Sequence, residues 1–216
     1  MKRKKMPTQR QRTFHRAAAV AALLALLAAV RGYNFTRDQA RREMEDRYGL
    51  GETQVVKELG ELPAGHEKWN LYYAADRNTA VIYELEFDLR YGWSWGACVK
   101  KSYTPEKAVS ASLLLLEASP GGETTAYCFG RVEVPGVERL AFRSLEPDSG
   151  ALLTEETSSR RAEWVTRNEK WYFAFSVPAP TGDAEDSPRL ELSGYDGEGS
   201  LVFRQGLQAD RRKVFG

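Results

Sequence analysis

The chain has 216 residues, and its contents of 42% hydrophobic and 28% charged residues are typical of a folded protein. Its net charge of +1 is unevenly distributed, because residues 1–16 contain seven Lys or Arg residues and no acid. The rest of the chain carries 24 basic and 30 acidic side chains, a net charge of −6. Nucleic acid is therefore not expected as a partner, because phosphate contacts need concentrated positive charge.

A single long apolar run, AAAVAALLALLAAV, follows the basic tail at Ala17–Val30. A basic head before an apolar run is typical of a secretory signal peptide or a membrane anchor. Fourteen residues make about 21 Å of helix, less than the roughly 30 Å of a bilayer core. The longer stretch Phe14–Tyr33 is sufficient if Arg16 and Arg31 extend toward the lipid headgroups. We therefore expect residues 17–32 to be a transmembrane helix or signal anchor with the lipid bilayer as partner; a cleaved signal peptide and a buried soluble helix are the alternatives.

The distribution of Lys and Arg predicts the orientation of this span. Seven precede the apolar run, and five follow it closely within residues 31–47. Because the more basic flank usually stays in the cytoplasm, residues 1–16 are expected to be a cytoplasmic tail. The body would then be an extracytoplasmic domain of a single-pass protein of the cell membrane, or a secreted domain if the signal is cleaved.

The segment 33–104 is expected to be a helix followed by an antiparallel meander. Thr36 with Gln39 three residues later forms a capping box, which predicts a helix over Arg37–Tyr48. Thr53–Leu62 fits a strand or a second short helix. The clearest strand alternates apolar residues from Val81 to Tyr91 with largely charged ones, which indicates one buried and one open face. Its expected hairpin partner is Trp69–Ala74.

The segment 105–206 shows short strands separated by Pro and Gly turns, which is typical of a small, Ig-like β-sandwich. The fold class is therefore mainly β (α+β), and residues 207–216 are expected to form a flexible tail. The expected strands of the sandwich are Val109–Glu117, Thr124–Val134, Val137–Ser144, Ala151–Glu155, Glu163–Arg167, Lys170–Val177, Arg189–Ser193 and Ser200–Gln205.

Residues that could carry catalysis or bind metal are few. His66 is the single histidine of the body, and the two cysteines are 30 residues apart without a C-x-x-C pair. We therefore expect no metal site, no cofactor and no catalytic residue. Cys98 and Cys128 could form a disulfide in an oxidising compartment or remain two unpaired structural thiols.

Aromatic residues are the most suggestive binding feature. Trp69, Tyr72, Trp93 and Trp95 could form an exposed surface that stacks on a ligand, with Tyr72 the one most expected to point outward. The alternative is that these side chains form the core of a small sheet, because aromatic residues favour strands and bury large areas.

The layout resembles uncharacterised single-pass membrane-anchored extracytoplasmic proteins of Gram-positive bacteria. The resemblance rests on the basic tail with its apolar run, the Phe35-Thr36 helix start, and the motifs Tyr91-Gly92-Trp93, Gly130-Arg131-Val132…Pro135-Gly136-Val137 and Tyr195-Asp196-Gly197-Glu198-Gly199. It implies no activity.

Together these features predict a non-catalytic binding or interaction module at the cell surface, with an unknown protein or cell-envelope partner. The alternative is a regulatory or assembly factor that senses through its ectodomain. A surface enzyme is the least favoured of the three classes.

Overall fold

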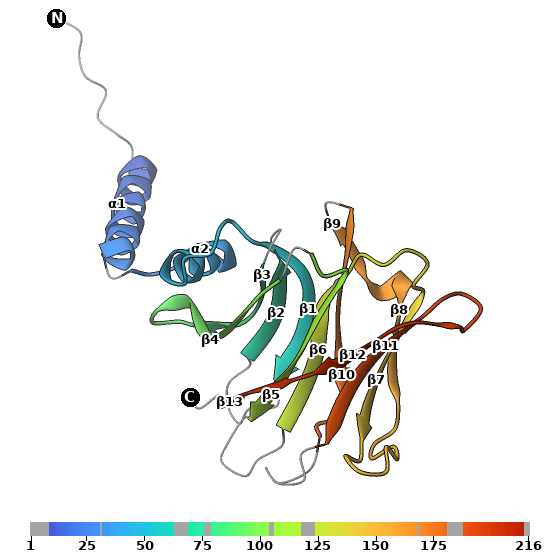
Figure 1. Cartoon of the computed structure of the whole chain (residues 1–216). Coiled ribbons are helices and arrows are strands. Elements are labelled where there is room, and N and C mark those ends of the chain that lie inside the picture. Colours follow the sequence, from blue (N-terminus) through green and yellow to red (C-terminus); the bar gives the residue numbers. More distant parts are fainter. Residues whose placement is uncertain are drawn as a thin grey trace, which may run out of the picture.

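The computed structural model describes residues 9–30, 32–62, 69–75, 79–103, 106–117, 124–167, 169–180 and 188–213. His66 lies outside these residues. Two helices precede a mainly β body, in which three sheets are stacked as layers (Figure 1). Three separate clusters of buried side chains hold the layers together.

Helix α1 (Gln9–Val30) projects away from the body (Figure 1), and all of its described side chains are exposed. In the part of the chain that the structure describes, no helix is both long enough and apolar enough to cross a membrane, so the expected transmembrane helix over residues 17–32 is not supported there.

Helix α2 (Arg37–Arg47) begins as the sequence predicts. The Thr36 side chain accepts a hydrogen bond from the Gln39 backbone N–H, and the Gln39 side chain accepts from the backbone at the cap, so the capping box is complete. The helix buries Ala40 and Met44 against the first sheet.

The first sheet is an antiparallel meander in the order β1-β2-β3-β4. The expected hairpin between the second and third strands is confirmed, and the ambiguous segment before them is a strand. The strands are β1 (Gln54–Leu62), β2 (Trp69–Ala75), β3 (Thr79–Asp88) and β4 (Gly92–Ser102).

Strand β3 differs from its prediction, because both of its faces are covered. Val81 and Tyr83 pack beneath α2, whereas Ile82 packs toward the next sheet. Glu84, on the face expected to be open, is fully buried. The strand also ends at Asp88, so the apolar alternation beyond it belongs to a turn.

The second and third sheets form the predicted β-sandwich. Their spatial orders are β13-β5-β6-β10-β9 and β12-β11-β7-β8, antiparallel except between β13 and β5. The second sheet contains β5 (Val109–Glu117), β6 (Thr124–Val132), β9 (Val165–Arg167), β10 (Lys170–Val177) and β13 (Ala209–Lys213). The third contains β7 (Arg139–Leu145), β8 (Thr157–Arg160), β11 (Arg189–Tyr195) and β12 (Leu201–Leu207), with a 3-10 turn η1 (Arg161–Glu163) after β8.

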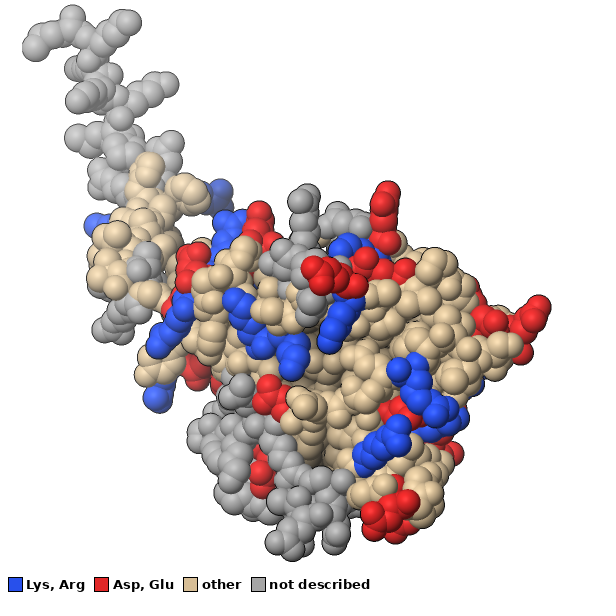
Figure 2. Space-filling view, viewed as in Figure 1, with Lys and Arg blue, Asp and Glu red and all other residues tan. Residues whose placement is uncertain are grey.

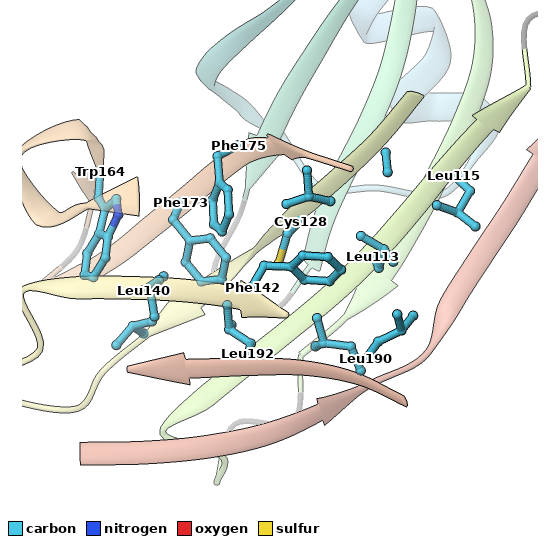
Figure 3. Close-up of a cluster of buried hydrophobic side chains, with 14 of the residues drawn as sticks. Leu113, Leu115, Cys128, Leu140, Phe142, Trp164, Phe173, Phe175, Leu190 and Leu192 are labelled. Carbon is cyan, nitrogen blue, oxygen red and sulfur yellow. The ribbon is translucent and has the colours of Figure 1, made fainter. Parts of the chain in front are cut away.

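The sandwich core lies between these two sheets and is built from large apolar side chains (Figure 3). Phe142 and Leu192 are fully buried neighbours on paired strands, and Trp164 closes one end. The Trp164 indole N–H donates to Ser159 Oγ at 3.0 Å, so its polar group is satisfied within the apolar layer.

Two sequence expectations for the C-terminal half are wrong. Ala151–Glu155 forms only a single bridge, between Leu152 and Leu145, and the strand in this region is β8. Residues 209–213 of the expected flexible tail instead form β13, which pairs in parallel with β5. A parallel edge strand is hard to predict, because its partner lies about a hundred residues away.

The meander and the sandwich share a buried layer, although the sequence suggested a boundary near residue 104. Tyr73 and Ile82 from the first sheet pack in one cluster with Leu114 and Phe129 from the second. Lys57 Nζ donates to the Ala174 carbonyl oxygen at 2.9 Å across the same junction.

Candidate functional site: the aromatic surface around α2 and the β3–β4 hairpin

Helix α2 is fixed to the first sheet by polar contacts as well as by burial. The nearly buried Glu45 carboxylate accepts hydrogen bonds from the Thr53 backbone N–H, at 2.9 Å, and from the Thr53 hydroxyl. The Arg41 guanidinium donates to the Thr53 carbonyl oxygen. Met44 Sδ lies 3.7 Å from Cys98 Sγ on β4. These contacts hold the helix in one place on the sheet.

Tyr72, expected to point outward, is buried with 2% of its surface exposed. The outer face of β2 is covered by α2, which sequence periodicity alone does not reveal. The Tyr72 ring stacks on the Tyr83 ring, with 5.7 Å between the two centroids. Burial raises the pKa of both hydroxyl groups, although nearby arginines oppose the shift. Tyr72 is thus part of the core and offers no ligand-binding surface.

Trp93 and Trp95 are half-buried beneath arginines of α2. The Arg37 guanidinium lies 4.7 Å from the Trp93 ring centroid, and that of Arg47 lies 5.4 Å from Trp95. Both distances suit cation–π contacts. Tyr48 adds an edge contact to Trp95 at 5.6 Å. The two tryptophans lie along the same side of β4, and α2 occupies much of the ring surface that a ligand would use.

Trp69, the fourth aromatic residue of the predicted surface, opens β2 opposite Leu62. Its side chain lies outside the described part of the structure. The structure therefore brings Tyr72, Trp93 and Trp95 together around α2, and leaves the binding role of the group a prediction.

Among the described large apolar side chains outside α1, the two most exposed, Leu89 and Tyr91, lie on the β3–β4 hairpin, which sequence reasoning missed. Leu89 is 84% exposed, Tyr91 68% and Phe87 48%. The sequence signal for these side chains is the alternation of apolar residues that continues after Leu85. The pattern predicts a strand that continues to Tyr91, whereas residues 89–91 form an unpaired turn and Phe87, near the end of β3, pairs with Trp93.

The base of this tip is rigid. Asp88 accepts a hydrogen bond from the Arg90 backbone N–H at 2.6 Å, and Gly92 has a φ of 74°, which suits glycine. A Cβ at Gly92 would lie 2.3 Å from the Asn34 carbonyl oxygen. The Trp93 N–H donates to that same oxygen at 2.8 Å. The segment between α1 and α2 is therefore fastened directly to the hairpin.

Cys98 and Cys128 are not joined by a disulfide in this structure. Cys98 faces Met44 under α2, whereas Cys128 lies in the sandwich core among the side chains of Figure 3. Because the two side chains belong to different layers, they do not meet. Burial raises the pKa of the Cys128 thiol, which keeps it protonated and unreactive.

The expectation of no catalytic residue passes over a G-x-S-x-G pentapeptide, which the chain contains at Gly92–Gly96. In hydrolases this motif places the serine on a sharp turn between a strand and a helix. Here it runs within β4, where Ser94 pairs with Glu86 on β3. Ser94 therefore lies within a paired strand and not on a strand-to-helix turn, so it is not positioned as the nucleophile of such a motif.

A small polar pocket of about 130 Å³ lies where the two halves meet. Its lining includes Lys101, Lys107, Ser110 and Ser112. The volume is below the about 300 Å³ at which sites for drug-sized ligands begin. Among the described residues, no group of three or more His, Cys, Asp or Glu side chains could hold a metal ion.

Charged side chains on the body are mixed rather than segregated. On the face shown in Figure 2, the described Lys and Arg residues are interspersed with Asp and Glu. One representative set joins Glu156 to Arg139 at 3.0 Å and to Arg143 at 2.6 Å. Burial acts to raise the pKa of Glu156, but the hydrogen bonds from Arg143 and Arg139 outweigh it and lower the pKa. These contacts stabilise the outer face of the third sheet.

Comparison with known proteins adds no relative: no family model, curated protein or solved structure matches the chain.

Proposed function

We propose that this protein is a non-catalytic binding module held at a membrane by α1, with its β body outside the cytoplasm. The observation that carries the proposal is the exposure of the apolar side chains along α1. The large ones are Phe14 (72% exposed), Val20 (58%), Leu23 (56%), Leu24 (61%), Leu26 (61%) and Val30 (78%).

Exposure of this apolar surface to water is energetically unfavourable. Apolar surface gains about 25 cal/mol per Å² when it leaves water, and soluble monomers rarely expose large contiguous apolar patches. Because the described side chains of α1 are all exposed, the body does not cover this surface. A lipid bilayer would cover it, which supports a membrane anchor in α1. The helical part of the stretch Phe14–Tyr33 ends at Val30 and is about 25 Å long.

The expected orientation rests on the flanking charges. Seven Lys or Arg residues before the apolar run and five close behind it support a cytoplasmic N-terminus. The body then faces away from the cytoplasm, with α2 and the first sheet closest to the membrane.

The strand order of the sandwich supports an Ig-like assignment and a binding role. The orders β5-β6-β10-β9 and β12-β11-β7-β8 correspond to the immunoglobulin orders A-B-E-D and G-F-C-C′. Sandwiches of this kind commonly present loops or a sheet face to partners, which is an argument by analogy of fold. The nearly buried carboxylates of Glu45 and Glu191 are engaged with neighbouring residues, which suits a structural role.

Membrane fractionation tests the proposal. The full chain is expected to stay with membranes after high-salt and alkaline washing, whereas the variant Leu23→Glu Leu24→Glu should become soluble. The matched control Leu201→Glu Val202→Glu changes two partly exposed apolar residues on β12 and should leave membrane association unchanged. A wild-type chain in the soluble fraction would contradict the anchor.

Protease treatment of intact cells tests the orientation. Digestion of the body from outside is the expected result, and full protection would overturn the proposed topology. The mass of the mature chain separates an uncleaved anchor from a signal peptide, because cleavage would remove residues 1 to about 32.

A further inference from the structure

We propose that the tip of the β3–β4 hairpin, formed by Phe87, Leu89, Arg90 and Tyr91, rests on the same lipid surface that α1 enters. Two membrane contacts would then fix the orientation of the body relative to the bilayer, whereas α1 alone would leave it free to reorient. This inference rests on the proposed membrane role of α1 and adds a second, separate contact surface to it.

The hairpin is fastened close to the end of α1. Helix α1 ends at Val30, and Asn34 forms a parallel bridge with Gly92 at the hairpin. The Trp93 N–H donates to the Asn34 carbonyl oxygen at 2.8 Å. Four residues span at most about 14 Å. The tip therefore remains near the place where the chain leaves the apolar run.

The limit of about 14 Å between Val30 and Asn34 can be compared with the thickness of the headgroup region of a membrane. The headgroup region adds about 5–8 Å on each side of the hydrocarbon core. If Val30 marks the boundary of the core, a hairpin fastened at Asn34 lies within or just above the headgroups. Figure 1 shows α1, α2 and the β4 hairpin on the same side of the molecule.

The composition of the tip fits an interfacial position. Leu89 is 84% exposed and Tyr91 is 68% exposed, so both can enter the headgroup layer without rearrangement of the fold. Tyrosine is enriched at this depth because its ring is apolar and its hydroxyl remains hydrated. Arg90, also exposed, can pair with anionic lipid phosphates while its stem lies along the apolar surface. Phe35, 50% exposed beside Tyr33, lies on the linking segment and extends the apolar surface toward α1.

The base of the tip is also ordered by neighbouring side chains. Phe87 packs on Trp93 at 5.3 Å between ring centroids, and Arg37 covers Trp93 from α2. A carbon atom added at Gly92 would clash with the Tyr33 ring, so this ring lies directly against the turn. Because these neighbours already order the base, membrane contact immobilises little additional chain.

A lipid surface fits the tip better than a protein partner does. Stable protein interfaces bury about 800 Å² on each side, which four side chains do not supply. The tip instead stands beside the segment that leads from α1, on which Phe35 is also exposed, and it combines leucine, tyrosine and arginine as interfacial segments do.

The test uses the full chain reconstituted into phosphatidylcholine vesicles that contain phosphatidylglycerol. A polarity-sensitive thiol dye is attached in three variants: Leu89→Cys at the tip, Val20→Cys in α1, and Leu201→Cys on β12. Leu201 is the matched control, because it is 49% exposed and follows the β11–β12 turn, which lies on the side of the body away from α1 (Figure 1). The wild-type chain gives the background labelling of Cys98.

The expected result is that the dye at positions 89 and 20 shifts its emission to shorter wavelength and is quenched by doxyl-labelled lipid, while the dye at position 201 keeps its aqueous emission. A shift at position 20 alone would overturn the second contact and leave the proposed function intact. An aqueous signal at position 20 would overturn the proposed function. Equal shifts at positions 89 and 201 would indicate general adsorption and would overturn the tip proposal.

The variant Arg90→Glu, combined with the dye at position 89, tests the electrostatic part of the contact. We expect its emission shift to shrink in vesicles that contain phosphatidylglycerol and to change little in pure phosphatidylcholine. An unchanged shift in both vesicle types would overturn the pairing of Arg90 with lipid phosphate.

Discussion

The sandwich core and the layer beneath α2 solve the problem of burial in different ways. The sandwich encloses Leu, Phe and Val side chains between two sheets, with few polar atoms to satisfy. The layer beneath α2 instead combines Tyr72, Tyr83, Trp93 and Met44 with arginines that lie over the rings. One helix covers the sheet incompletely, so large aromatic side chains, together with the arginines that lie over their rings, complete the cover.

The two regions are therefore expected to have different roles, one in the stability of the body and the other in the position of the hairpin and the linker. The sandwich gains its free energy from apolar burial and is expected to set the stability of the whole body. The layer beneath α2 positions the segment that leads from α1 and the hairpin that stands beside it. Substitutions in the two regions should therefore have different consequences, and four of them measure the difference.

Phe142→Ala is expected to have the largest effect, because the ring is fully buried between the two sheets of the sandwich. Loss of a buried phenylalanine costs about 3–5 kcal/mol of unfolding free energy, which urea unfolding measures. Leu201→Ala is the control, because an exposed site of this kind changes stability by less than about 0.5 kcal/mol. Similar losses at both positions would contradict the assignment of the core.

Met44→Ala removes the fully buried side chain that joins α2 to Cys98. We expect a loss of about 2–3 kcal/mol, toward the lower end for such truncations, because a helix lying on a sheet can settle into the space. Hydrogen exchange should accelerate in α2 and β4 and remain slow in β10. Arg42→Ala, an exposed site on the same helix, is the control. Equal loss of protection in β10 would mean that the two regions form one cooperative unit.

Gly92→Ala sharpens the comparison at the joint between linker and hairpin. The variant combines a strained positive φ with a clash against Asn34, so we expect a loss of about 1–3 kcal/mol and faster exchange of the Trp93 amide. Gly199→Ala is a matched control, because Gly199 also has a positive φ of 84° but open space around its Cβ position. If both variants lose equal stability, the clash at Asn34 contributes nothing.

Glu156→Gln should have the smallest effect and depend on pH. The folded-state pKa of Glu156 is lowered by Arg143 and Arg139, so its contribution is present above the ordinary carboxyl value of 4.5 and is lost as pH falls through the lowered pKa. The variant should be less stable by about 0.5–1 kcal/mol at pH 7, and the difference should disappear in acid. A constant difference from pH 7 to acid would rule out the charge as its source. Glu198→Gln removes a carboxylate from an exposed turn and controls for general charge effects.

Local patterns predicted the elements that depend on local interactions. The capping box at Thr36 determined the start of α2, and the alternation from Val81 with the neighbouring segment Trp69–Ala74 predicted the β2–β3 pair. The sequence predicts the alternation of β3, but the face expected to be open, with Ile82 and Glu84, is buried, because it faces the second sheet, whose residues are distant in the chain. Strand β13 was missed for the same reason, since its partner β5 is distant in the chain.

The candidate site was recovered only in part. The sequence singled out Trp93 and Trp95, which do lie together, but it placed Tyr72 outside when α2 buries it. It assigned Leu89 and Tyr91 to a strand, and only the turn at Asp88–Gly92 shows them as an unpaired tip.

By itself, the sequence determined the basic tail and its apolar run, the mainly β character and the capped helix, because these follow from composition and from interactions over a few residues. The tertiary structure decided which faces are covered, where the two cysteines lie, and that the hairpin is fastened to the segment between α1 and α2. Those features depend on contacts between residues far apart in the chain, such as Asn34 with Gly92 and Met44 with Cys98, and no local pattern encodes them.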